Sequence, residues 1–327
     1  MQHIDMRQAL CQALDEELTR DERVFILGEE VAEYNGPYKV TKGLLDKFGP
    51  SRVIDTPISE SAFSGLAIGA AMTGLRPVVD FMSFNFSFVA ADQIISNAAK
   101  LYYMSGSRFK VPIVFRGPNG AAAQVSCQHS NCVESIYSNV AGLIIIAPSN
   151  AYDAKGLLKS AIRDDNPILF LESELLYGEK MEIPTEEYLI PIGKANIIKK
   201  GKDCTLISYS RMMPFAYEAA QKLEEKGISV ELIDLRTIKP LDIETIFESV
   251  KKTNFCVIAE EGPHFGSVGS EITFQIQERC FDYLDAPVGK VSQKETPLPY
   301  SKVLEEASLV NVERIIASVE NTVSNPI

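Results

Sequence analysis

Residues 143–171, LIIIAPSNAYDAKGLLKSAIRDDNPILFL, carry the pattern that decides the fold. Leu143–Ile146 and Ile168–Leu171 are short apolar runs without polar alternation, which is typical of strands covered on both faces. The stretch 151–164 between them has the apolar spacing of a helix. Two strands joined by a helix of this length lie parallel in one sheet. The sequence therefore predicts an α/β fold built on a parallel sheet.

The same alternation of strands and helices continues on both sides of that stretch. The other predicted strands are Val24–Leu27, Val78–Val79, Val111–Phe115, Thr205–Ser208, Val230–Ile233 and Cys256–Ala259. The other predicted helices cover residues 6–18, 62–74, 88–103, 132–140, 213–226, 242–252, 268–280 and 312–321. Between Tyr177 and Gly193 the alternation stops at Pro184 and Pro191, which is typical of a boundary between two domains.

The composition excludes several classes of protein. The 327 residues include 32 Lys and Arg against 44 Asp and Glu, a formal charge of −12. Such a charge repels polyanions and argues against nucleic acid as a partner. Six scattered cysteines lack the spacing of a disulfide scaffold. The longest uncharged apolar stretch, 62–75, is too short to span a membrane. We expect a cytoplasmic protein, or an organelle-matrix protein trimmed of its targeting segment.

Glu60 is the first candidate for a functional residue. It lies between a predicted strand and an almost entirely apolar helix, and ligands of open parallel sheets collect at such strand ends. A carboxylate there can simply favour the helix N-terminus. It can also be a buried group with a raised pKa that shares a proton with a ligand. The residues alone leave both interpretations open.

His129 is the second candidate, in a polar loop between Cys127 and Cys132. Structural zinc would need a fourth ligand that no second Cys/His pair nearby supplies. A histidine at a strand end can act as an acid or base near neutral pH, or it can be structural. Gly266-Ser-Val-Gly269 lacks the third glycine of a dinucleotide-binding motif, which favours a tight turn at a helix start.

Several short motifs follow one another in a fixed order along the chain. They include DTPISE at 55–60, GLRP at 74–77, FMSFNF at 81–86, YYMSG at 102–106, RGPNG at 116–120, QHS at 128–130, DAKG at 153–156 and LRTI at 235–238. With these motifs the sequence resembles, nearly end to end, the beta subunits of the thiamine diphosphate-dependent, decarboxylating components of 2-oxo-acid dehydrogenase complexes. The motifs Phe84-Asn-Phe86 and Tyr102-Tyr-Met104 favour the branch that acts on pyruvate.

The resemblance implies a transketolase-like fold. A domain that binds the pyrimidine of thiamine diphosphate would cover residues 1–180, a linker 181–192, and a smaller C-terminal α/β domain 193–327. The resemblance also implies an enzyme that is active only with an alpha subunit, in an α₂β₂ heterotetramer. Enzymes of this kind hold Mg²⁺ and the diphosphate with a Gly-Asp-Gly motif, which this chain lacks. The alpha subunit is therefore expected to supply those ligands.

The same resemblance assigns roles to individual residues. Glu60 would hydrogen-bond the aminopyrimidine, and His129 would transfer a proton or guide an incoming lipoyl group. Ile58, Met82 and Phe86 would line the pyrimidine site. A structural potassium ion would be bound largely through main-chain oxygens of Ile113, Ala161, Ile162, Asp164 and Asn166. Asn131 and Ile136 stand where the family usually has Gln and Trp, so this chain departs from the family pattern beside His129.

The expected reaction is the oxidative decarboxylation of pyruvate, with transfer of the acetyl group to lipoamide of a dihydrolipoyl acyltransferase core. The lipoyl and subunit-binding domains of that acyltransferase are therefore expected partners. Two enzyme alternatives remain: a branched-chain 2-oxo-acid or acetoin dehydrogenase beta subunit, and the detached C-terminal half of a transketolase-type enzyme. A non-catalytic assembly subunit is the third alternative.

Overall fold

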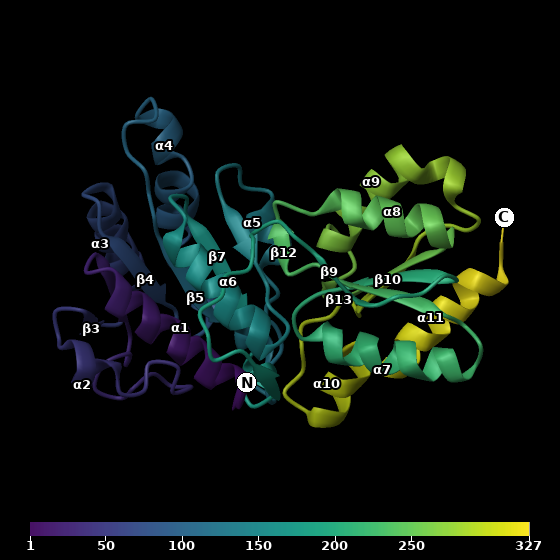
Figure 1. Cartoon of the computed structure of the whole chain (residues 1–327), viewed down its shortest axis with the longest axis horizontal. Helices are drawn as coiled ribbons and strands as arrows, with labels where there is room; N and C mark the ends of the chain where they lie inside the picture. The colour runs from purple at the N-terminus through teal and green to yellow at the C-terminus, as the bar shows by residue number, and fades with distance from the viewer. Residues whose placement is uncertain (327) are drawn as a thin grey trace. The chain divides into compact units, whose positions relative to one another are not determined.

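The computed structural model describes residues 1–326, which divide into two compact units. Unit 1 contains residues 1–119 and 136–192. Unit 2 contains residues 120–135 together with the chain from Gly193 onward. The chain therefore leaves unit 1 after Asn119 and returns to it at Ile136. The purple N-terminal part in Figure 1 belongs to unit 1 and the yellow C-terminal part to unit 2.

Unit 1 is built on a parallel sheet with the strand order β6-β7-β5-β4-β2-β3. Its strands are β2 (Val24–Gly28), β3 (Val53–Asp55), β4 (Arg76–Asp80), β5 (Val114–Pro118), β6 (Ile144–Ile146) and β7 (Ile168–Glu172). Every residue of β2, β5 and β7 is buried. Runs of branched apolar residues suit strands that are covered on both faces.

Helices α1 (Met6–Arg20) and α6 (Ala151–Arg163) lie side by side in unit 1 (Figure 1) and pack into one hydrophobic cluster with the sheet. A capping box starts α1, because Asp5 accepts a hydrogen bond from the Gln8 N–H at 2.8 Å and the Gln8 side chain accepts one from Asp5 N–H at 3.1 Å. The remaining helical segments of this part of the chain are α2 (Leu44–Phe48), α3 (Glu60–Met72), α4 (Leu101–Met104), α5 (Glu134–Ser138), a π-helical turn (Gln93–Ala98) and 3₁₀ turns at Phe84–Phe88, Cys127–His129 and Glu174–Leu176.

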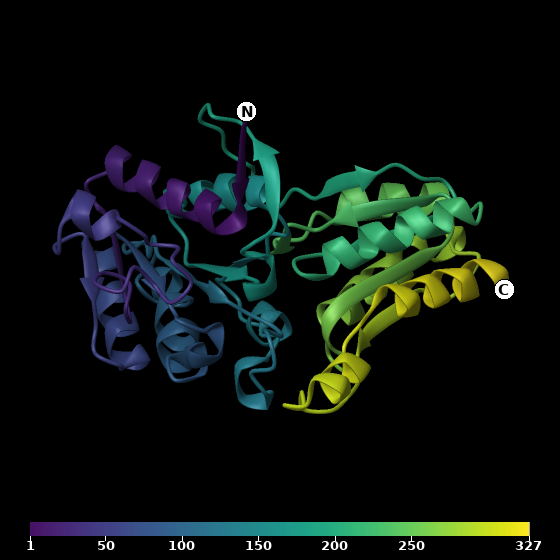
Figure 2. The ribbon, with the colours of Figure 1, turned by 90° about the horizontal axis from the view of Figure 1, so that it is seen from below.

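Unit 2 contains a second sheet with the order β14-β13-β10-β11-β9, in which β9 alone is antiparallel. Its elements are β9 (Asn196–Lys199), β10 (Cys204–Ser208), α7 (Met212–Glu225), β11 (Val230–Asp234), β12 (Thr237–Lys239), α8 (Ile243–Thr253), β13 (Cys256–Pro263), α9 (Val268–Cys280), a 3₁₀ turn (Phe281–Tyr283), β14 (Gly289–Gln293), α10 (Lys302–Ser308) and α11 (Val312–Ser324). Helices α7 and α11 lie side by side on one face of this sheet, and α8 and α9 lie on the other (Figures 1 and 2).

The predicted α/β class is confirmed, and local differences have physical causes. The strand predicted from Val111 begins at Val114, because Pro112 cannot donate to the ladder. The single helix predicted over 88–103 is wrong: a π-helical turn and the short α4 replace it. The sequence analysis missed the antiparallel pair β1 (Gln2–Asp5) and β8 (Lys180–Ile183), whose mixed composition lacks an apolar run. Within residues 1–326, no helix combines the length and apolarity needed to cross a bilayer.

Candidate active site

Three buried carboxyl groups lie at the carboxyl end of the unit 1 sheet. Strands β2, β3 and β4 end in register, with Gly28 paired to Asp55 on one side and to Asp80 on the other. Glu29 follows β2 directly, and Glu60 begins the helix that follows β3. The side chains of Glu29, Glu60 and Asp80 are all buried. Since ligands of parallel sheets bind at this edge, the three carboxyl groups mark a candidate site.

Glu60 is buried at the N-terminus of α3, where its side chain is only 6% exposed. The helix that it begins consists almost entirely of apolar and small residues, and the Ser59 side chain does not cap it. The first N–H groups of a helix carry partial positive charge and favour a nearby carboxylate. The fold therefore keeps an acidic group in a poorly solvated place, where it can share a proton with a polar ligand.

Glu29 is a functional candidate that the sequence analysis missed. Burial raises the pKa of its carboxyl to about 7, together with the negative charges of Glu60 and Asp80 and a hydrogen bond to Glu60. The two glutamates thus form a carboxyl pair that holds a proton near neutral pH. The sequence contained a signal for Glu29, because this acidic residue directly follows a buried apolar strand. Glu60 likewise comes shortly after the end of a strand.

The surroundings of this pair contain polar atoms that the chain itself does not satisfy. Among the described residues, none gives a hydrogen bond to the buried Glu29 Oε1, Thr56 Oγ1 or Ser64 Oγ. Thr56 is tied to the end of β2 by its N–H, which donates to Gly28 O at 2.9 Å, and Ser64 lies one turn after Glu60 on α3. Buried polar atoms normally have partners. The unpaired oxygens of Glu29, Thr56 and Ser64 fit a site for a polar ligand.

The raised pKa of Glu29 predicts how stability depends on pH. The unfolded chain loses this proton near pH 4.5 and the folded chain near pH 7, so this contribution to stability is complete below 4.5 and is lost as the pH rises to about 7. Glu29→Gln cannot ionise. We expect its melting temperature to match the wild type near pH 5 and to exceed it by roughly 2–4 °C or more at pH 8.

The control for this measurement is Glu30→Gln, which changes the exposed neighbour of Glu29. Thermal unfolding of the three proteins at both pH values checks the prediction. An unchanged gap between wild type and Glu29→Gln at pH 5 and pH 8 would show that Glu29 does not titrate in this range.

The loop after β4 carries Met82 and Phe86, which were expected to line the pyrimidine site, together with further aromatic residues. Phe81 and Phe84 belong to the core, with ring centroids 5.4 Å apart, and Phe81 also stacks on Phe115 at 6.0 Å. Met82 and Phe86 are half-buried. They remain accessible on the same strand-end loop as Asp80, whereas Ile58 is 83% exposed. The loop that follows Asp80 therefore offers two half-buried apolar side chains.

His129 belongs to a different unit of the chain from the other candidate residues. It is an exposed residue of the segment 120–135, which belongs to unit 2, whereas Glu29, Glu60, Met82 and Phe86 belong to unit 1. The backbone around His129 forms a 3₁₀ turn at Cys127–His129. No group of three His, Cys, Asp or Glu side chains in the described part of the chain is arranged to hold a metal ion.

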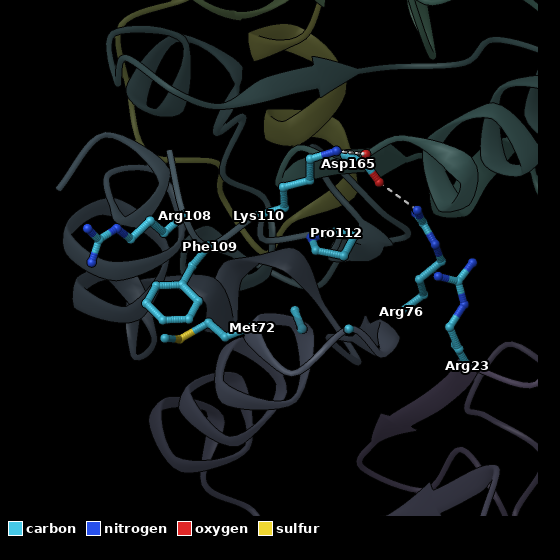
Figure 3. Close-up of a pocket in the computed structure, with 10 residues that line it drawn as sticks. Arg23, Met72, Arg76, Arg108, Phe109, Lys110, Pro112 and Asp165 are labelled. Carbon is cyan, nitrogen blue, oxygen red and sulfur yellow. Dashed lines mark hydrogen bonds and ion pairs between the residues drawn. The ribbon is translucent and has the colours of Figure 1, made fainter. Parts of the chain in front are cut away.

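Of the main-chain oxygens proposed for potassium, those of Ala161, Ile162, Asp164 and Asn166 lie where α6 ends and β7 begins. The Ile113 oxygen lies just before β5, where it accepts from the Ile168 N–H at 2.9 Å. Arg76 NH1 donates to Ile162 O at 3.0 Å and to Asp164 O at 2.8 Å. The carbonyls at the end of a helix attract positive charge, and here they already face a guanidinium group. The Arg76 side chain lines a pocket of about 370 Å³, in which Asp165 pairs with both Arg76 and Lys110 (Figure 3).

Comparison with known proteins identifies the class. Residues 2–180 match the family model "Transketolase, pyrimidine binding domain", and residues 193–315 match "Transketolase, C-terminal domain". A solved structure titled "Split gene transketolase, inactive beta4 tetramer" superposes with a TM-score of 0.83, covering 99% of this chain and 100% of that one at 21% identity. The chain is therefore a transketolase-like protein with pyrimidine-binding and C-terminal α/β domains.

Curated relatives narrow the class. The chain is 53% identical to "Pyruvate dehydrogenase E1 component subunit beta" of Rhizobium meliloti, over 98% of this chain and 70% of that protein. It is 53% identical to the subunit of the same name in Rickettsia felis, over 97% of each chain. It is also 53% identical to the mitochondrial subunit beta of Rattus norvegicus, over 98% of this chain and 91% of that one. The chain belongs to the family of pyruvate dehydrogenase E1 component beta subunits.

Proposed function

We propose that this chain is the beta half of an enzyme that decarboxylates pyruvate oxidatively and passes the acetyl group to lipoamide. The observation that carries the proposal is the buried carboxyl pair Glu29–Glu60 beside unpaired polar atoms, in a chain about half identical to pyruvate dehydrogenase beta subunits. Thiamine diphosphate, when bound, supplies the carbon that attacks the 2-oxo group and accepts the electrons released with CO₂.

In this proposal the chain holds the pyrimidine end of the cofactor. Glu60 hydrogen-bonds a ring nitrogen and moves a proton to or from it, which a carboxyl in a poorly solvated site does well. Glu29 keeps the shared proton available near neutral pH, because its pKa is about 7. Met82 and Phe86 pack against the ring, and Ile58 covers it when the subunits assemble.

His129 acts at the substrate end in the same proposal. His129 is exposed, and a histidine side chain can give or take a proton at neutral pH. Its place on a polar loop suits a proton transfer to the substrate, or a contact that guides the lipoyl group. The main-chain oxygens of Ile113, Ala161, Ile162, Asp164 and Asn166 would bind potassium, which would share the Ile162 and Asp164 carbonyls with Arg76.

The partner in the proposal is an alpha subunit, in an α₂β₂ assembly, which brings the ligands for Mg²⁺ and the diphosphate. The sequence contains no Gly-Asp-Gly, and hard oxygen ligands for a divalent ion must come from elsewhere. Lipoyl and subunit-binding domains of a dihydrolipoyl acyltransferase are the further partners. We place the enzyme in the cytoplasm or an organelle matrix, consistent with mitochondrial relatives, with domains over 1–180 and 193–327.

Because the alpha subunit is proposed to supply the ligands for Mg²⁺ and the diphosphate, the isolated chain should bind the cofactor weakly. Calorimetric titration of the purified chain with thiamine diphosphate and Mg²⁺ should show binding at least about 100-fold weaker than titration of the assembly with its alpha subunit, since the charged tail lacks ligands. Tight binding by the chain alone would contradict the proposed sharing of the site.

Substrate choice tests the function itself. The chain, co-expressed with the matching alpha subunit, should turn over pyruvate in preference to 2-oxoisovalerate and acetoin, and should acylate a lipoyl domain. Preference for 2-oxoisovalerate or acetoin would favour a branched-chain or acetoin dehydrogenase. Transfer of two-carbon units between sugars without lipoyl acylation would favour a transketolase-type enzyme.

A further inference from the structure

The loop that carries His129 is closed at its base by main-chain contacts. The Gly120 N–H donates to Asn131 O at 3.0 Å, so the two ends of the loop 120–131, which belongs to unit 2, are joined directly. Inside the loop, Ser130 Oγ donates to Ser126 O at 2.7 Å. The contact at 131 uses the carbonyl oxygen, so the departure from the family pattern at Asn131 leaves the closure in place.

The base of the loop is fastened to β13 by one buried carboxylate. Glu261 Oε1 accepts hydrogen bonds from the Ala121 N–H and from Arg211 NH1, each at 2.7 Å. Gly120 has a φ of +78°, and a Cβ there would lie only 2.6 Å from Glu261 Oε2. Glycine is therefore needed for both the backbone conformation and the close approach of the carboxylate.

Apolar contacts also hold the two ends of the loop against the rest of unit 2. Ala121, which is 1% exposed, clusters with Leu298 and Leu309 in unit 2. On the returning side, the Cys132 side chain packs against the backbone of Gly262, since a Cβ at Gly262 would lie 3.3 Å from Cys132 Cβ. The entry and the exit of the loop are thus fixed to β13 and its surroundings, while the loop from 123 to 129 is largely exposed.

The neighbouring Glu260 performs a different task. Its carboxylate accepts from Ser267 Oγ and from the Gly269 N–H, the latter at 2.9 Å, and so holds the start of α9. It also accepts from Ser292 Oγ at 3.4 Å, and these three partners lie outside residues 120–131. Two adjacent buried glutamates of β13 therefore have separate partners, and one of them serves as a matched control for the other.

We propose that Glu261, paired with Arg211, is the positioning residue that fixes the loop 120–131 and thereby places His129 for its step with the substrate or the lipoyl group. This inference rests on the role given to His129 in the proposed function. A carboxylate is suited to the task because a charge-assisted hydrogen bond to a backbone N–H is stronger and more directional than a neutral one. Arg211 pairs with this carboxylate at 2.7 Å and so offsets the cost of burying its negative charge.

The test uses the chain assembled with its alpha subunit and a lipoyl domain as acceptor. Glu261→Ala should lower the rate of lipoyl acylation about tenfold, since a loop displaced by an ångström or so weakens catalysis strongly. The double variant Glu261→Ala/His129→Ala should be no slower than His129→Ala alone, because both changes remove one action. Glu261→Gln keeps the shape of the side chain and one acceptor oxygen, so its rate of lipoyl acylation should fall less. This variant also tests the proposal if Glu261→Ala fails to fold.

Hydrogen exchange supplies a readout that is independent of activity. Amide exchange of residues 121–131 should accelerate in Glu261→Ala and Glu261→Gln, and should stay at the wild-type rate in Glu260→Gln, which loosens the start of α9 instead. Unchanged exchange of the loop in both Glu261 variants would overturn the positioning role. So would additive losses in the double variant. Wild-type acylation by His129→Ala, with faster loop exchange in Glu261→Ala, would instead reject the role of His129 in the proposed function.

Discussion

Glu60→Gln is expected to lower pyruvate turnover by the assembled enzyme at least about 100-fold, within the usual range for loss of an acid–base group. The amide has nearly the same shape as the carboxyl, but it can neither carry nor release a proton. Because Glu60 is only 6% exposed at the start of α3, bulk water does not readily take over its role. Steady-state kinetics with an artificial electron acceptor measures the effect without the lipoyl step.

A matched control distinguishes the loss of the transferable proton from the loss of a favourable charge at a helix N-terminus. Glu271→Gln removes an exposed first-turn carboxylate from α9, and should cost about 0.3–1 kcal/mol of stability with turnover unchanged. Size-exclusion chromatography establishes that both variants still assemble with the alpha subunit. Turnover by Glu60→Gln within a few-fold of the wild type would remove Glu60 from the chemistry.

Arg116→Met is expected to have the largest effect on stability, a loss of about 3–5 kcal/mol. Arg116 is buried on β5, donates from Nε to Glu172 Oε1 at 2.6 Å, and also pairs with Asp80. Tyr177 OH donates to the same Glu172 at 2.7 Å. Methionine fills a similar volume but leaves two buried carboxylates without their cation. Chemical denaturation monitored by circular dichroism gives the free energy of unfolding.

Two further variants test the cause of that loss. Arg116→Met combined with Glu172→Gln removes one of the stranded charges and should recover part of the stability. Arg23→Met removes a half-exposed arginine paired with Asp21, and should cost no more than about 1 kcal/mol. If the double variant were less stable than Arg116→Met alone, stranded negative charge would not be the cause.

The sequence was sufficient where a pattern is local and strong. Strand Val230–Asp234 and helix Val268–Cys280 were predicted to within a residue, because an apolar run or a helical spacing marks each. Short polar strands such as β1 and β8 gave no such signal, since their pairing joins residues about 180 positions apart. The helix predicted over 88–103 failed because the helical spacing of its apolar residues does not reveal a π-helical turn within it.

The candidate site was predictable in part for a related reason. Glu60 stood out as an acid between a strand and an apolar helix, but Glu29 did not, because the raised pKa of its carboxyl depends on its burial and on the charges of Glu60 and Asp80. Those charges come together only when three parallel strands end in register. The contact between Glu261 and Ala121 was equally invisible, since it joins residues 140 positions apart.

The path of the chain through residues 120–135 limits how this gene can be divided. A fragment that starts at Gly193 would lack the segment that packs against β13, and would leave Glu261 and Arg211 without the Ala121 amide. A fragment ending before 193 would carry the same segment with nothing to fasten it. The two halves therefore cannot be exchanged between homologues as independent modules, and any chimera has to take residues 120–135 from the parent that supplies its C-terminal half.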